Sequence, residues 1–195
     1  RITVVHAAAG SQFRAYTPTE IQATLHGYGL QHDSYILTVG TLEPRKNHTA
    51  LINAYPRLRT TLAAEGVEAP PLAIAGGHGW KYEDILAAPE RAGVEQHVRW
   101  LGKVPAEQLP LLMAGAQVFA YPSLYEGFGL PVLEALACGA PVVAANNSSL
   151  PEVLGDAGLY CDALDTESIA QALKTLLSDA ALRARLRQAG PARAA

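Results

Sequence analysis

Short runs of Val, Ile, Leu and Ala alternate with longer helix-like stretches from residue 35 onward, and this alternation limits the chain to few folds. We read strands at residues 35–39, 72–75, 98–101, 118–121, 141–144 and 158–160. We read helices at residues 47–64, 82–92, 106–114, 131–138, 166–177 and 180–188. Strands that alternate with helices are typical of a parallel sheet with both faces covered. The predicted fold class is therefore α/β: a doubly wound, mostly parallel six-stranded sheet with helices on both faces, Rossmann-like.

Prolines and the start of the chain refine this prediction. Pro56 and Pro89 fall inside two predicted helices, where each should cause a kink or an early end. Residues 1–6 read as a strand, and residues 7–18 lack periodicity, as a connection would. We therefore assign residues 1–18 to an entering strand and its connection, and residues 19–195 to one domain.

The composition argues against several classes of function. The formal net charge is -3, which leaves no basic footprint for DNA or RNA. Although 49% of the residues are hydrophobic, no run approaches the length that crosses a bilayer. Cys138 and Cys161 lie far apart in apolar stretches and the histidines show no metal-ligand spacing, so no metal site is expected. With no secretion signal at its start, the chain is expected to be cytoplasmic.

The segment from Glu126 to Glu134 carries the strongest sign of a binding site. It reads E-G-F-G-L-P-V-L-E, so seven residues separate the two carboxylates. It follows a predicted strand, and Pro131 suits the first turn of a helix. Backbone N–H groups at a helix start attract phosphate, and Gly127 and Gly129 let a ligand approach closely. The sequence thus predicts an anion site at this corner.

The two glutamates have different surroundings. Glu126 stands in the loop before the predicted helix, and Glu134 lies about one turn inside it among apolar residues, where a carboxylate usually has a partner. Hydroxyl groups of a polyol are natural partners, since one carboxylate accepts two such hydrogen bonds. The alternative is that Glu134 only complements the helix dipole and that Glu126 is a solvated loop residue. Spacing alone favours neither interpretation.

A second anion signal follows the first predicted strand, where the chain reads G-T-L-E-P-R-K-N. Ligands of a doubly wound sheet collect beyond the carboxyl ends of its strands, so this loop and the Glu126 corner should face one crevice. An arginine binds phosphate oxygens as a fork and a lysine as a point charge, so together they fit a diphosphate. The alternative is two solvated cations in a surface turn. The loop contains Gly40, Thr41, Arg45, Lys46 and the predicted helix N-cap Asn47.

Two further glycine corners follow neighbouring strands. Residues 76–79 read G-G-H-G, for which we favour a loop-shaping role. Residues 102–105 read G-K-V-P, where Lys103 and Val104 could frame a flat base through backbone contacts.

No G-x-x-x-x-G-K-[ST] occurs and no G-x-G-x-x-G follows a strand, which disfavours nucleoside triphosphate hydrolysis and ordinary dinucleotide binding.

At these residues the chain resembles the C-terminal, nucleotide-sugar-binding lobe of the family-four retaining glycosyltransferases, which have the GT-B fold. Four stretches carry the resemblance. They are V-G-T-L-E-P-R-K-N at 39–47, L-G-K-V at 101–104, Y-P-S-L-Y-E-G-F-G-L-P-V-L-E at 121–134 and S-L-P-E-V at 149–153. The first and third are most similar to the mannosyltransferase branch, which commonly uses GDP-mannose.

The resemblance implies a role for each matching residue. Glu134 would hold the ribose hydroxyls, and Glu126 would contact hydroxyls of the donor sugar. Many relatives have arginine in place of Thr41, so Arg45 would take over that phosphate contact and, with Lys46, neutralise the leaving diphosphate. The implied catalytic residues are Glu126, Arg45 and Lys46. The implied donor-binding residues are Gly40, Thr41, Arg45, Lys46, Lys103, Val104, Glu126, Gly127, Phe128, Gly129, Leu130 and Glu134.

The same resemblance implies transfer of a hexose, with mannose favoured, from GDP-mannose or a related nucleotide sugar, with retention of the anomeric configuration. No metal or other cofactor is implied, because the nucleotide sugar is a substrate. The acceptor site would belong to an N-terminal lobe of the same polypeptide, linked through residues 1–18, and that lobe could bring the protein to a membrane surface. This lobe alone is expected to bind donor weakly and to be nearly inactive, because positioning and water exclusion need both lobes.

Three other interpretations are compatible with the sequence. One is a noncatalytic nucleotide-sugar sensor or subunit that meets a separately encoded lobe. Another is a sugar-nucleotide epimerase of related architecture, which would release free nucleotide without an acceptor. The third is a plain α/β interaction module, for which no nucleotide binds and Glu126→Ala and Glu134→Ala change nothing.

Overall fold

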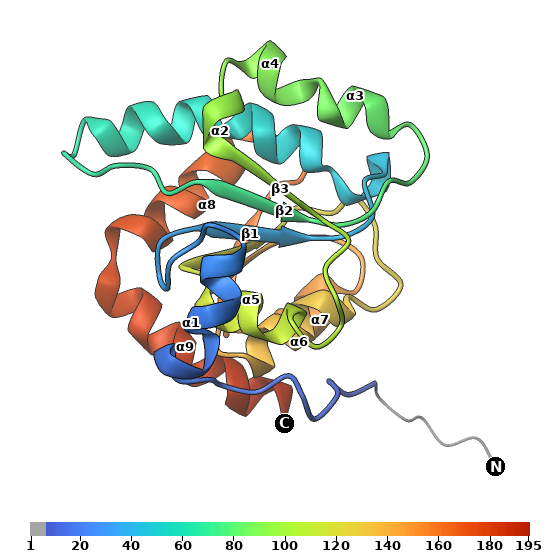
Figure 1. Ribbon diagram of the computed structural model, residues 1–195, viewed down its shortest axis with the longest axis vertical. Helices are drawn as coiled ribbons and strands as arrows, with labels where there is room; N and C mark the ends of the chain where they lie inside the picture. The colour runs from blue at the N-terminus through green and yellow to red at the C-terminus, as the bar shows by residue number, and fades with distance from the viewer. Residues whose placement is uncertain (1–6) are drawn as a thin grey trace.

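A parallel sheet of six strands runs through the middle of the protein in the computed structural model, which describes residues 7–195 (Figure 1). The strands are β1 (Ile36–Val39), β2 (Leu72–Ala75), β3 (Val98–Gly102), β4 (Val118–Tyr121), β5 (Val142–Ala145) and β6 (Gly158–Cys161). Their order is β3-β2-β1-β4-β5-β6, and every neighbouring pair is parallel. The predicted class, topology and strand number are confirmed.

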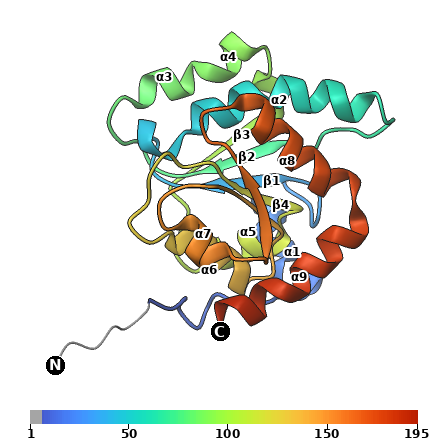
Figure 2. The ribbon, with the colours of Figure 1, turned by 180° about the vertical axis from the view of Figure 1, so that it is seen from behind.

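Helices cover both faces of the sheet (Figures 1 and 2). One face carries α2 (His48–Ala63), α3 (Tyr82–Leu86), α4 (Ala88–Ala92) and α8 (Thr166–Ser178). The other carries α1 (Pro18–Gly27), α5 (Leu109–Gly115), α6 (Leu130–Ala137) and α7 (Leu150–Leu154). The last helix, α9 (Ala180–Ala194), follows α8 and packs against α6. Two short 3-10 turns are η1 (Pro44–Lys46) and η2 (Glu95–His97).

Each inner strand divides its side chains between two cores. In β1, Ile36 joins the core beneath α2 and α8, whereas Leu37 joins the core beneath α5 and α6. Because helices cover both faces, β2, β4 and β5 are buried throughout, which explains their continuous apolar sequences. Burying one Leu or Ile side chain contributes about 1.5–3 kcal/mol. The sheet is therefore a firm platform for the loops at its carboxyl edge.

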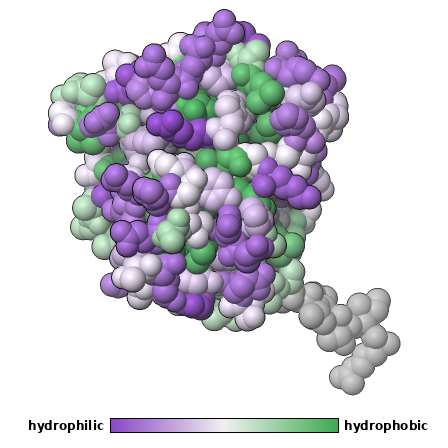
Figure 3. All heavy atoms as spheres, viewed as in Figure 1, coloured by the Kyte–Doolittle hydropathy of each residue, from purple (hydrophilic) through white to green (hydrophobic). Residues whose placement is uncertain are grey.

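The surface is mixed in character. On the face shown in Figure 3, apolar residues are scattered among polar ones. Among the described residues, the most exposed large apolar side chains are Trp80, Tyr125 and Leu164. No helix within residues 7–195 is both long and apolar enough to span a bilayer.

Proline has different effects in different helices. Pro56 does not end α2, which runs on to Ala63 because its apolar face stays buried. The predicted helix at 82–92 divides at Ala87, and Pro89 falls in the first turn of α4, where its missing N–H costs nothing. Helix α9 continues through Pro191, beyond its predicted end at residue 188.

Two helices, α1 and α7, were not predicted from the sequence. Helix α1 begins with a capping box, in which Glu20 Oε2 accepts a hydrogen bond from the Thr17 N–H at 2.7 Å. Pro18 occupies its first turn, so the T-P-T-E pattern is a helix start signal in the sequence. Helix α7 has five residues, too few for a periodic pattern. The predicted strand at residues 1–6 lies outside the described residues.

Candidate functional site

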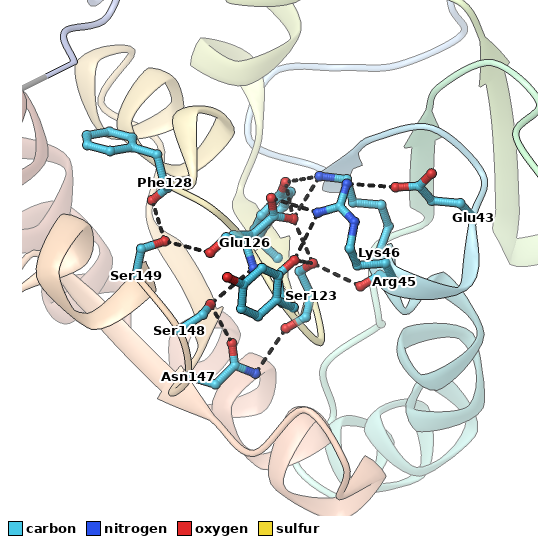
Figure 4. A network of polar contacts seen from close by, with 11 residues as sticks. Glu43, Arg45, Lys46, Ser123, Glu126, Phe128, Asn147, Ser148 and Ser149 are labelled. Atoms are coloured by element: carbon cyan, nitrogen blue, oxygen red, sulfur yellow. Dashed lines mark hydrogen bonds and ion pairs between the residues drawn. The ribbon is translucent and has the colours of Figure 1, made fainter.

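The two anion signals meet at the carboxyl edge of the sheet (Figure 4). Lys46 Nζ donates to Glu126 Oε1 at 2.7 Å, and Arg45 Nη1 donates to Glu126 Oε2 at 3.0 Å. Both cations come from η1, after β1, and Glu126 comes from the loop after β4. Because β1 and β4 are neighbours where the strand order reverses, their loops lie at the usual ligand position of a doubly wound sheet.

Glu126 is a buried, fully engaged carboxylate rather than a solvated loop residue. Only 7% of it is exposed. Its Oε1 also accepts hydrogen bonds from the Tyr121 hydroxyl at 2.9 Å and from Ser123 Oγ at 2.7 Å. Burial alone would raise the pKa of Glu126, but the hydrogen bonds from Lys46 and Ser123 outweigh it and hold the pKa below its ordinary value. The group is therefore ionised at neutral pH.

The two cations differ in their surroundings. The Lys46 side chain is only 11% exposed and contacts Glu126 and the Tyr121 hydroxyl. The Arg45 side chain is 41% exposed and also donates to the Tyr125 carbonyl at 2.9 Å and to Glu43 Oε1 at 2.7 Å. Neither is a free surface charge, which argues against the interpretation as solvated cations. A bound phosphate would have to share or replace these acceptors.

The loop from Glu126 to Leu130, here called the glycine corner, presents backbone N–H donors beside the Glu126, Arg45 and Lys46 side chains. Helix α6 begins at Leu130, after Gly129 with a φ of 96°, a left-handed conformation that favours glycine. Within residues 7–195, the amides of Gly127, Phe128 and Gly129 make no hydrogen bond to the protein. These unpaired N–H groups at a helix start form a natural anion cradle.

Glu134 has the surroundings predicted for it but no partner from the chain. It lies in α6, half-buried, and its side chain forms no hydrogen bond or ion pair within the described residues. Burial raises its pKa to about 7. A half-buried carboxylate without a hydrogen-bond partner is stabilised by any ligand hydroxyl that donates a hydrogen bond to it.

The glycines at 76–79 shape the neighbouring loop. A Cβ atom added to Gly76 would lie 1.9 Å from the Gly40 carbonyl oxygen, so only glycine fits. The Leu42 N–H donates to the Gly77 carbonyl, and the Gly79 N–H donates to the Leu42 carbonyl. These bonds hold Gly40 and Thr41 at the edge of the site. Lys103 and Val104 follow β3, which is joined to the same loop through the bond from the Gly76 N–H to the Gly102 carbonyl.

Asn47 is the N-cap residue of α2, as predicted, but without the side-chain capping bond that an N-cap asparagine usually makes. It precedes α2 with a φ of 59°, which asparagine tolerates, and its side chain makes no capping bond. Instead Nδ2 donates to the Pro122 carbonyl at 2.9 Å and to the Ala163 carbonyl at 2.8 Å. Asn47 therefore ties the β1 loop to the loops after β4 and β6.

Several residues of the site were not predicted. Tyr121 and Ser123 bind Glu126, and three residues after β5 support the corner from behind. The side chains of these three, Asn147, Ser148 and Ser149, are drawn in Figure 4. Of these three only Ser149 belongs to a stretch singled out in the sequence, S-L-P-E-V at 149–153, and its spacing gives no hint of hydrogen bonds to a loop more than 20 residues away.

Comparisons with known proteins agree over most of the chain. The family model for "Glycosyl transferases group 1" matches residues 28–193. O-antigen chain mannosyltransferase B of Escherichia coli is 43% identical over 179 residues, which are 92% of this chain and 46% of that protein. The GDP-mannose-dependent alpha-(1-6)-phosphatidylinositol monomannoside mannosyltransferase of Mycolicibacterium smegmatis is 38% identical over 161 residues, or 78% of this chain and 41% of that protein. The chain spans about half the length of the curated relatives it matches.

A solved structure shares the fold. HepE of Anabaena, crystallised in complex with UDP and glucose, superposes with a TM-score of 0.83 at 23% sequence identity. The superposition covers 98% of this chain and 52% of that chain.

Proposed function

Since the chain belongs to the glycosyl transferases group 1 family and folds like a lobe of the GT-B enzymes, we propose that it is the donor-binding lobe of a retaining glycosyltransferase. The observation that carries this proposal is the contact of Glu126 with Lys46 and Arg45, beside the unpaired amides of the glycine corner. Cations and amides that converge on one point suit a diphosphate.

Each part of the donor has a proposed place. The diphosphate lies between Lys46 and the amides of residues 127–130, with Arg45 at its side. Glu134 accepts hydrogen bonds from the ribose hydroxyls, which supply the partner that its half-buried carboxylate lacks. Glu126 meets the hydroxyls of the donor sugar. Gly40, Thr41, Lys103 and Val104 frame the nucleoside through the loops after β1 and β3.

The proposed glycosyl transfer depends on stabilising the negative charge that develops on the leaving diphosphate. In glycosyl transfer the bond from the anomeric carbon to the diphosphate oxygen breaks, so an oxocarbenium-like centre and a more negative leaving group develop together. Lys46, Arg45 and the helix start stabilise that leaving group. The acceptor hydroxyl forms the new bond to the anomeric carbon and passes its proton to the leaving diphosphate. We assign no nucleophile to the protein, because Glu126 is already held by Lys46, Tyr121 and Ser123.

We propose a mannose donor, with GDP-mannose favoured. Support comes from the names of the relatives, two of which are a mannosyltransferase and a GDP-mannose-dependent mannosyltransferase. We also propose that transfer needs an acceptor-binding lobe of the same polypeptide and no metal cofactor. Positioning of the two substrates and exclusion of water both favour closure of two lobes over the donor.

Calorimetric titration with GDP, UDP, GDP-mannose and UDP-glucose tests this proposal. We expect saturable binding with a preference for the guanosine ligands. Glu134→Ala should weaken binding by about 1–3 kcal/mol, the cost of leaving hydroxyl partners unpaired. Glu90→Ala, on the exposed face of α4, is the matched control and should change nothing.

Two outcomes would count against the proposal. If no ligand bound at millimolar concentration, the chain would not be a donor-binding lobe. Preference for UDP ligands would refute only the choice of donor.

A further inference from the structure

Three consecutive residues after β5, Asn147, Ser148 and Ser149, form hydrogen bonds with the loop after β4 that contains the glycine corner. The single Ser149 hydroxyl proton is shared in a three-centre hydrogen bond between the Phe128 carbonyl at 2.8 Å and the Glu126 carbonyl at 3.1 Å (Figure 4). Ser148 Oγ accepts a hydrogen bond from the Glu126 N–H at 3.1 Å. Leu150 Cδ2 lies 2.7 Å from the place of a Cβ on Gly129, so the backbone there touches α7 directly. The corner is therefore attached to the β5–α7 loop at both of its ends.

These bonds fix the direction of two unpaired amides. In a planar trans peptide, the carbonyl of one residue and the N–H of the next point in opposite directions. Because the carbonyls of Glu126 and Phe128 point to Ser149, the N–H groups of Gly127 and Gly129 must point away from it. Neither amide has a partner within residues 7–195. The serine thus orients both amides toward the same side of the corner.

The peptide bond between Tyr125 and Glu126 shows to which side of the glycine corner these two amides point. The Glu126 N–H points to Ser148, so the Tyr125 carbonyl must point the other way, and there it accepts a hydrogen bond from Arg45 Nη1 at 2.9 Å. The side of the corner opposite the serines is thus the side that Arg45 occupies. The amides of Gly127 and Gly129 therefore point to the side of the corner on which Arg45 lies.

The serine loop is itself held in an unfavourable conformation. Ser148 has a φ of 48°, which is uncommon for a residue other than glycine and costs of order 1–3 kcal/mol. Its hydroxyl donates to Asn147 Oδ1 at 3.0 Å, and Asn147 Nδ2 donates to the Ser123 carbonyl at 3.1 Å. Such a conformation persists only where the surroundings fix it, and here they fix it against the corner.

We propose that Ser149 is a positioning residue for donor binding, which aims the Gly127 and Gly129 amides at the diphosphate. The proposal rests on the proposed function. In this proposal Ser149 does not contact the substrate, and it acts through the Glu126 and Phe128 carbonyls to which it is hydrogen-bonded. Without the hydroxyl, the corner peptides are free to rotate, and the amide pair loses its common direction.

Titration with GDP and with guanosine separates positioning from simple stabilisation. Ser149→Ala should weaken GDP binding about tenfold, the effect of losing roughly one well-placed hydrogen bond. Guanosine binding should not change, because guanosine has no phosphate to meet the amides. Ser149→Thr keeps the hydroxyl and should restore most of the GDP affinity. Ser34→Ala is the matched control, since it removes a serine-to-carbonyl bond of 2.8 Å in the loop before β1. All titrations are made below the unfolding temperature of each variant.

The outcomes are distinct. Equal GDP affinity of Ser149→Ala and Ser34→Ala would overturn the positioning role and leave the proposed function intact. An equal loss of GDP and guanosine affinity would also overturn it, because the effect would then be general. Failure of the unaltered protein to bind GDP would refute the proposed function itself, and the role of Ser149 with it.

Discussion

Two glutamates with seven residues between them, Glu126 and Glu134, have opposite electrostatic states. Glu126 is held by four donors, and its pKa lies below the ordinary value although it is buried. Glu134 has no donor within the described residues, and burial raises its pKa to about 7. The first carboxylate therefore stabilises the empty site, whereas the second weakens it until a ligand supplies hydroxyl groups.

Glu134→Gln should stabilise the ligand-free protein at pH 8 and weaken nucleotide binding. The pKa of Glu134 is raised from 4.5 to about 7 on folding, so the folded state binds the proton more tightly and stability falls as pH rises through this range. Glutamine carries no charge and avoids that loss. We expect a gain of about 1 kcal/mol at pH 8, after a discount for solvent screening.

Urea denaturation at pH 5 and pH 8 measures the effect. At pH 5 folded Glu134 is mostly protonated, so the difference between the variant and the unaltered protein should shrink. Glu90→Gln serves as the control on an exposed helix position. An unchanged difference between the two pH values would show that burial does not perturb this carboxylate.

At the scale of elements, the site is an assembly of loops that support one another. The β1 loop is held from one side by the glycines after β2, and the β4–α6 corner is held from behind by the loop after β5. Asn47 ties the first of these loops to the second through the Pro122 carbonyl. A change in a supporting loop should therefore reach the site without touching a ligand.

Gly76→Ala is the sharpest test of that support. The new Cβ would lie 1.9 Å from the Gly40 carbonyl oxygen, so the β1 loop must shift. We expect a loss of stability of about 3 kcal/mol, typical of overpacking in a tight site, together with weaker GDP binding. Thermal and urea unfolding measure the first effect, and calorimetry measures the second.

Gly27→Ala is the matched control. Gly27 ends α1 with no atom within 4 Å of an added Cβ, so alanine should raise stability by about 0.5–1 kcal/mol. If Gly76→Ala were as harmless as Gly27→Ala, the proposed support of the β1 loop by the glycine turn would be wrong.

The elements also show what the sequence can and cannot predict. The strands were predictable because β2, β4 and β5 are apolar throughout, and the contact of Glu126 with Lys46 follows from neighbouring strand ends. Helix α7 is too short for a periodic pattern. The bonds of Ser149 join loops more than 20 residues apart, and no local rule encodes such a contact.

At the scale of the whole molecule, the doubly wound order brings loops that are distant in sequence to one edge of the sheet. β1 and β4 are separated by two strands in the chain and are neighbours in the sheet. That edge holds Lys46, Glu126 and the start of α6, and it is where we propose that the donor binds. The hollow beside α8, lined by Leu124, Asn146 and Leu164, is a competing surface at the same edge.

Amide-resolved NMR titration with GDP locates the bound ligand residue by residue. We predict saturable shifts at Gly40, Lys46, Gly127 and Gly129, and in α6 around Glu134. Shifts confined to the hollow beside α8, or no shift at millimolar GDP, would contradict a donor site between the β1 loop and the β4–α6 corner.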